Sequence, residues 1–169
     1  MNSQRILVLG GLLLFLAGLV YGLYYDGIAA GERYNTMLYN IDMAVNMAAK
    51  GDITTASAFV RDFGSADRTQ IFQARISYHL VMAGAATMLP LWLITRLDMS
   101  ERIKRLLALL LVTGGGLLAV GDYFSLTSPR SAGYYVILAG YAWMAFALFG
   151  FFSYALLFGW LNQEDKKRG

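Results

Sequence analysis

The chain has 169 residues, of which 57% are hydrophobic and 15% are charged, and its formal net charge is +3. A soluble domain is about 25% charged, so this composition favours an integral membrane protein over a soluble one. The chain contains no cysteine, which excludes disulfides, thiolate metal sites and haem attached through cysteine.

Four long apolar blocks, almost free of charge, predict four membrane-spanning helices. A helix needs roughly 20 apolar residues to cross the hydrocarbon core, and lipid offers the backbone no other partner. The predicted spans are residues 6–25, 76–95, 104–124 and 133–161. The whole chain, 1–169, is therefore expected to be a single all-α integral membrane domain, an antiparallel bundle of four transmembrane helices. The first block is longer than the roughly 7–15 apolar residues of a signal peptide, so we expect it to stay in the membrane.

Between the first two spans, residues 26–75 are predicted to form a short extramembrane helical hairpin. Apolar residues lie at helical spacing on one face of its first helix, namely Tyr34, Met37, Leu38, Ile41, Val45 and Ala48. Gly51 is expected to end this helix, and Asp52 or Thr54 to cap the next one. Gly64 is expected to end that second helix, after which a third continues into the second span. We expect the hairpin to rest on the outer mouth of the bundle.

Small residues and one proline mark the packing surfaces of the spans. Gly18 and Gly22 form a GxxxG spacing in the first span, and Gly114 and Gly121 share one face of the third. Small residues let helices approach closely in lipid, so we expect packing within the bundle, with contact between copies of the chain as the alternative. Pro90 should bend the second span.

Basic residues predict the orientation in the membrane. Four of them crowd the short loop between the second and third spans, namely Arg96, Arg102, Lys104 and Arg105. Positive-inside reasoning places this loop, both termini and a tail at 162–169 in the cytoplasm, with the hairpin outside. In a bacterial inner membrane, which is the expected location, the hairpin is then periplasmic.

Two ionisable residues, His79 and Asp122, lie in or at the edge of a span, where such groups are costly. His79 lies 17 residues from Arg96 (96 − 79), and Asp122 lies 17 residues from Arg105 (122 − 105). At a rise of 1.5 Å per residue, both therefore stand about 25 Å above the inner boundary. Because the second and third spans are neighbours, we predict a contact between the two side chains near the outer edge of the membrane.

Together with Tyr78 and Tyr123, this pair is the candidate cofactor-binding site. A structural hydrogen-bonded patch is the expected role, since polar groups cost least at the membrane edge. One alternative is ligation of haem b by His79, with Met82, Met88 or another subunit supplying the second ligand. The other alternative is quinone binding. No metal site is expected, because one histidine with carboxylates is a weak ligand set.

The sequence carries no signature of a hydrolase, a metalloprotease, a phosphate loop or a dinucleotide site, so a non-catalytic role is expected. We expect an accessory or scaffold subunit, or an assembly factor, of an inner-membrane complex such as a respiratory one. Its expected partners are the lipid bilayer and a larger membrane-protein complex or a second copy, with no nucleic acid. The alternatives are a haem b- or quinone-binding redox anchor and a small membrane sensor or transporter.

Overall fold

The computed structural model describes the backbone of residues 2–127 and 130–168, and the side chains of 2–127 and 132–157. Its elements are α1 (Ser3–Tyr24), the π-helix η1 (Tyr25–Ala29), α2 (Ala30–Ala49), α3 (Ile53–Met88), α4 (Leu91–Ile94), α5 (Glu101–Thr127) and α6 (Arg130–Arg168). Four helical segments of the described chain are long and apolar enough to cross a membrane: Ser3–Ala49, Ile53–Ile94, Glu101–Thr127 and Ala132–Leu157. The prediction of an all-helical chain with four such segments is confirmed.

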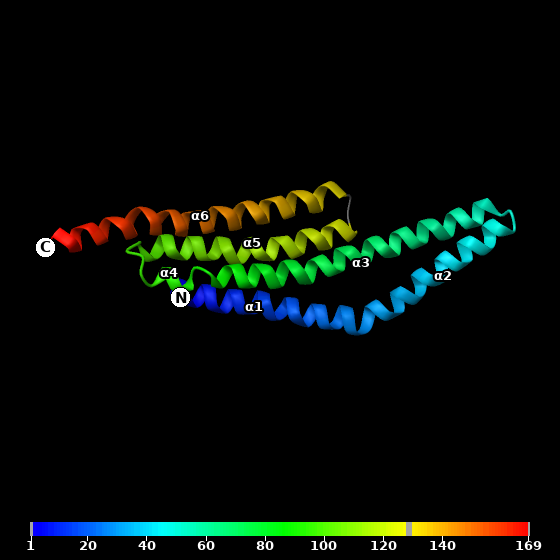
Figure 1. Ribbon diagram of the computed structural model, residues 1–169, viewed down its shortest axis with the longest axis horizontal. Helices are drawn as coiled ribbons and strands as arrows, with labels where there is room; N and C mark the ends of the chain where they lie inside the picture. The colour runs from blue at the N-terminus through cyan, green and yellow to red at the C-terminus, as the bar shows by residue number, and fades with distance from the viewer. Residues whose placement is uncertain (1, 128–129, 169) are drawn as a thin grey trace.

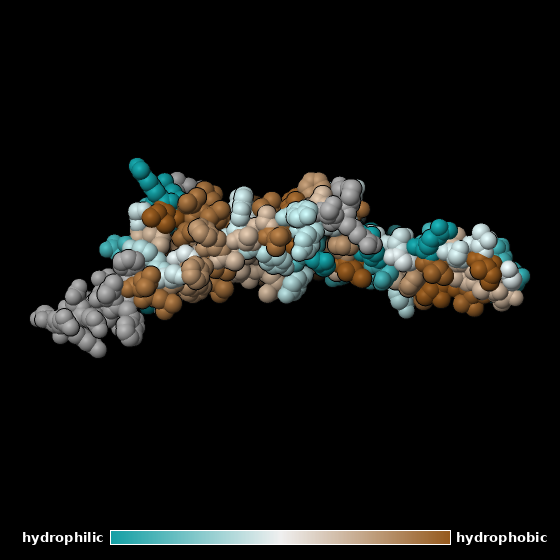
Figure 2. Space-filling model, turned by 90° about the horizontal axis from the view of Figure 1, so that it is seen from above, coloured by the Kyte–Doolittle hydropathy of each residue, from teal (hydrophilic) through white to brown (hydrophobic). Residues whose placement is uncertain are grey.

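The four long helices α1, α3, α5 and α6 lie side by side in that order (Figure 1). α5 packs against both α3 and α6, while α1 packs against α3 and, to a smaller extent, against α5. α6 packs mainly against α5, so α3 and α6 flank α5. The apolar core lies along these contacts and includes Leu7, Leu14, Ala83, Leu111, Leu118 and Phe151. Figure 2 shows mainly brown and tan atoms over the four-helix part, with teal atoms gathered towards its ends and on the hairpin.

Glycines bring α1 close to α3. A side-chain carbon on Gly18 would lie 2.7 Å from the backbone nitrogen of Val81, and one on Gly22 would lie 2.6 Å from the Ser77 hydroxyl. The Ser77 hydroxyl donates a hydrogen bond of 2.9 Å to the Gly18 carbonyl. The GxxxG spacing therefore packs within the chain, as expected.

Glycines also line the contact between α5 and α6. A side-chain carbon on Gly114 would lie 2.9 Å from the Gly140 carbonyl oxygen, and one on Gly121 would lie 2.9 Å from that of Gly133. Each helix contributes two glycines seven residues apart, and the pairs match in opposite order along the two helices. With no side chains between them, the two backbones come close enough for extensive van der Waals contact.

α2 and the first part of α3 form a hairpin that projects beyond the ends of α5 and α6 (Figure 1). The expectation that it rests on the mouth of the bundle is therefore wrong. Gly51 ends the first helix with a φ of 80°, in the left-handed region that favours glycine. Asp52 caps α3 by accepting a 3.1 Å hydrogen bond from the Thr55 N–H. Hydrogen bonds from Thr55 hold the pKa of this carboxyl below its usual value. The helix end at Gly51 and the cap at Asp52 agree with the predictions from the sequence.

The predicted helix end at Gly64 is wrong, because α3 runs without a break from Ile53 to Met88. One glycine inside a helix costs only about 1 kcal/mol. Here the residues on both sides of Gly64 belong to the stretch of α3 that packs against α2. That tertiary contact outweighs the local preference of glycine.

The face that α2 turns towards α3 differs from its most apolar face. Asn40 and Ala44 are the buried residues of α2. The apolar row predicted from the sequence stays mostly outside: its members Tyr34, Leu38, Ile41 and Val45 are between 45% and 63% exposed. We call these four residues the α2 stripe. It lies on the flank of the hairpin.

α1, η1 and α2 form one continuous helical run that bends near η1 (Figure 1). A π-helical turn in an α-helix is a common cause of such a bend. Arg33 links the bend to α3: its guanidinium donates a 3.1 Å hydrogen bond to the Tyr25 hydroxyl and another to the Gln73 side chain.

The second predicted span, 76–95, is interrupted rather than bent at Pro90. α3 ends at Met88 and the short α4 begins at Leu91, because proline has no N–H to continue the helix. The Ala86 carbonyl accepts a 3.3 Å hydrogen bond from Leu89 instead. At the other end of the chain, the predicted tail 162–169 is helical as far as α6 extends. Residues 128–129 and 169 lie outside the described part.

Candidate functional site

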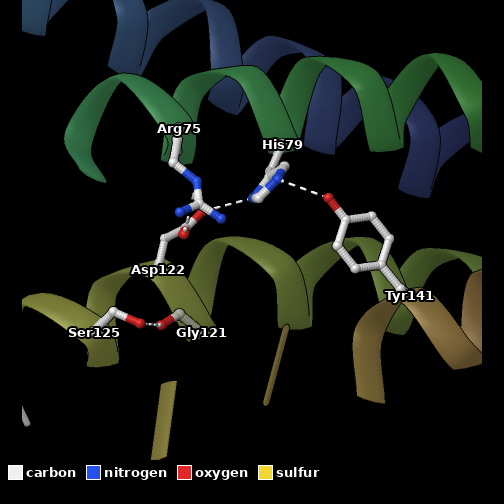
Figure 3. Close-up of polar contacts among 6 residues, drawn as sticks. All are labelled: Arg75, His79, Gly121, Asp122, Ser125 and Tyr141. Carbon is white, nitrogen blue, oxygen red and sulfur yellow. Dashed lines mark hydrogen bonds and ion pairs between the residues drawn. The ribbon is translucent and has the colours of Figure 1, made fainter. Parts of the chain in front are cut away.

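A chain of polar contacts links α3, α5 and α6 at the site predicted from the sequence (Figure 3). His79 Nδ1 lies 2.5 Å from Asp122 Oδ2. On the other side of the imidazole ring, His79 Nε2 lies 3.0 Å from the Tyr141 hydroxyl. Arg75 Nε lies 3.6 Å from Asp122 Oδ1. The predicted contact between His79 and Asp122 is present, and Arg75 and Tyr141 extend it.

Helix geometry explains how these groups meet. Arg75 and His79 are four residues apart, so both lie on the face of α3 that meets α5. On α5, Asp122 directly follows Gly121, where α6 comes close enough for a side-chain carbon to lie 2.8 Å from the Ile137 nitrogen. The Ser125 hydroxyl donates a 2.9 Å hydrogen bond back to the Gly121 carbonyl, within α5 (Figure 3). The close α5–α6 contact thus holds Asp122 between the neighbouring helices.

The chemistry of the partners assigns the protons. An ionised carboxylate only accepts hydrogen bonds, so His79 donates from Nδ1 to Asp122. In a neutral imidazole the other nitrogen then accepts, and the Tyr141 hydroxyl donates to it. Asp122 is fully buried and His79 is nearly so. Arg75 places a positive charge 3.6 Å from Asp122 Oδ1, which offsets part of the cost of burying the carboxylate.

One atom of this site has an incomplete set of contacts. Asp122 Oδ1 is buried without a hydrogen-bond partner in the described part of the chain. Its charged neighbour is Arg75, whose side chain is 43% exposed. Asp122 therefore depends on an arginine that reaches the surface.

Two adjoining grooves lie between α3 and α6, next to this polar chain. The first, of about 610 Å³, is lined by Arg68, Phe72 and Arg75 from α3 and by tyrosine and aliphatic side chains from α6. The second, of about 350 Å³, is more apolar and reaches His79. Tyr141 lines both grooves. The polar chain therefore borders a surface that is open between two helices, rather than a closed cavity.

The other two predicted site residues lie outside the polar chain. Tyr78 is exposed on α3 and borders the smaller groove, with its ring 6.0 Å from that of His79. Tyr123 is exposed on α5 and lines neither groove. Arg75 lies four residues before His79 in α3, so residue spacing alone is enough to place it beside His79. No local signal identified Tyr141, which is 62 residues away from His79.

The donor set fits haem ligation poorly. Both ring nitrogens of His79 already lie within hydrogen-bond distance of protein oxygens. Met82 is three residues from His79 on the same helix, so it cannot approach the opposite face of a haem. Met88 packs towards Gly11 of α1. Within the described residues, no group of three or more histidine or acidic side chains is placed to hold a metal ion.

Comparison with known proteins adds no relative: no protein-family model, no curated protein and no solved structure matches this chain.

Proposed function

We propose that this chain is a non-catalytic accessory, scaffold or assembly subunit of a larger complex in a bacterial inner membrane. In this proposal α1, α3, α5 and α6 form an antiparallel transmembrane bundle, with both termini and the basic 96–105 loop in the cytoplasm. Tyr24 and Tyr25 then lie at the outer interface, where aromatic residues concentrate. The hairpin formed by α2 and the start of α3 extends into the periplasm and carries the contact to the partner.

The observation that carries this proposal is the exposed α2 stripe. The hairpin turns Asn40 and Ala44 inward and leaves four large apolar side chains outside. α2 has 20 residues and is therefore about 30 Å long, so most of the stripe lies well beyond the bilayer. An apolar row at i, i + 4, i + 7 and i + 11 is the pattern with which a helix enters a hydrophobic groove on another protein. Exposed apolar rows of this kind are unfavourable in water unless a partner covers them.

Charge substitutions in the α2 stripe should release the chain from its complex. We expect blue native electrophoresis after mild detergent extraction to show the wild-type chain in a species much larger than its own 18.7 kDa. The variant Leu38→Glu/Val45→Glu should run as the released chain, because two buried carboxylates would abolish an apolar interface. Asn35→Glu, an exposed position beside the stripe, is the matched control and should keep the large species.

Two results would contradict the proposal. A chain that runs alone under every gentle condition would exclude a stable complex. A large species that contains only copies of this chain would assign the stripe to self-association instead.

A further inference from the structure

We infer that the groove between α3 and α6 binds an anionic phospholipid. Its phosphate lies between Arg68 and Arg75, and an acyl chain passes Tyr141 into the smaller, apolar groove. This inference does not depend on the proposed role of the α2 stripe, which lies on the hairpin and not on this groove.

The larger groove is positively charged. Arg68, Phe72 and Arg75 are spaced i, i + 4 and i + 7, so they share one face of α3. The two guanidinium carbons lie 5.5 Å and 5.4 Å from the centroid of the Phe72 ring, which holds both cations beside one aromatic side chain. Arg75 shares its charge with Asp122, but Arg68 makes no ion pair with any described residue. The groove thus carries a net positive charge.

An apolar path continues from these arginines. The smaller groove has a lining of mostly apolar side chains, among them Met82, Ala86, Met144 and Leu148. From Arg75 to Ala86 the path along α3 covers 11 residues, or about 16 Å. The two arginines at one end of an apolar groove of this length fit a phospholipid, with the phosphate at the arginines and a hydrocarbon chain along the groove.

The two arginines lie at one end of the predicted span, at the level of the lipid headgroups. Arg75 lies 21 residues from Arg96 (96 − 75) along α3 and α4, which corresponds to about 31 Å of helix. The hydrocarbon core is about 30 Å thick, so Arg75 reaches the headgroup region opposite the basic loop, and the Arg68 guanidinium, beside the same Phe72 ring, lies on the solvent side of it. Two guanidinium groups at the headgroup level can donate paired hydrogen bonds to a lipid phosphate.

The polar groups favour a phospholipid over a quinone. A quinone carbonyl accepts a hydrogen bond from a free donor such as a histidine or tyrosine side chain. In this groove the Tyr141 hydroxyl bonds to His79, and His79 in turn bonds to Asp122. The donors that remain are the guanidinium groups of Arg68 and Arg75. A guanidinium group can donate two parallel hydrogen bonds to the oxygens of a phosphate.

Native mass spectrometry of the purified full chain can test this inference, using dioleoyl phosphatidylglycerol and dioleoyl phosphatidylcholine as probes. We expect the wild-type chain to retain phosphatidylglycerol about fivefold to tenfold more strongly than phosphatidylcholine. Arg68→Gln should remove this preference. Ala145→Trp, which fills the smaller groove from an exposed position on α6, should weaken the retention of both lipids.

Arg61→Gln is the matched control, since it removes an equal charge from an exposed position on the same helix outside the groove. It should bind both lipids as the wild type does. Equal retention of the two lipids by the wild type would overturn the inference, as would an Arg68→Gln variant that keeps the preference. The inference would also be overturned if the wild type retained a short-chain ubiquinone but no phosphatidylglycerol. That result would assign the groove to a quinone.

Discussion

Replacing Asp122 with alanine should destabilise the protein by about 3 kcal/mol, near the lower end of the range for breaking a buried ion pair. The substitution removes the acceptor of the His79 hydrogen bond and leaves a buried imidazole N–H without a partner. It also removes the counter-charge of Arg75. Because the Arg75 side chain is 43% exposed, it can turn to solvent, and this keeps the loss below the upper end of the range.

The free energy of unfolding in mixed micelles is the measurement for this prediction. Asp62→Ala, which removes an exposed carboxylate from the hairpin, is the control and should change stability by less than about 0.5 kcal/mol. In a double-mutant cycle, His79→Ala should cost much less in the Asp122→Ala background than in the wild type. Additive effects of the two substitutions would contradict a direct coupling between these side chains.

The second large effect concerns the glycines of α5. Gly114→Ala and Gly121→Ala should each destabilise the protein by about 1–3 kcal/mol, the usual cost of overpacking. In both cases the new carbon would lie 2.9 Å from a carbonyl oxygen of α6, so the two helices would have to move apart. Since Gly114 and Gly121 are seven residues apart, the double variant should weaken the whole α5–α6 contact.

Gly116→Ala is the matched control for this prediction. Gly116 is in the same run of three glycines as Gly114, but a side-chain carbon there would meet nothing within 4 Å. This substitution should be neutral or should stabilise α5 by up to about 1 kcal/mol, since alanine favours the helix over glycine. Unfolding in mixed micelles measures all three variants. An equal loss at positions 114 and 116 would contradict the prediction, because it would show that the close contact with α6 does not determine the effect.

The sequence predicted those features that depend on hydropathy and on helical rise. The apolar blocks identified four helices, because only long apolar helices satisfy the backbone in lipid. The contact between His79 and Asp122 followed from counting residues in two neighbouring helices, since the rise per residue is nearly constant. The helix end at Gly51 was predicted correctly, and Asp52 was one of the two predicted caps, because a left-handed φ and an N-terminal cap are local properties.

The features that the sequence missed depend on the rotation and packing of whole helices. α6 is apolar on all sides in its membrane part, so its sequence does not specify which face meets α5, and Tyr141 could not be assigned to His79. In α2 the most apolar face was the natural choice for packing, yet the small side chain of Ala44 and the amide of Asn40 face α3. Likewise, Gly64 lies inside a helix that a tertiary contact extends.

The most direct test of the proposed role is photocrosslinking from the α2 stripe in intact membranes of cells that produce the chain. A photoreactive amino acid at Leu38 or Val45 should give one covalent adduct of the same discrete mass, formed with a protein other than this chain. The same group at Asn35, exposed beside the stripe, should give little of that adduct. The account would be contradicted if Leu38 and Val45 gave no adduct, if Asn35 gave as much, or if the adduct had twice the mass of the chain.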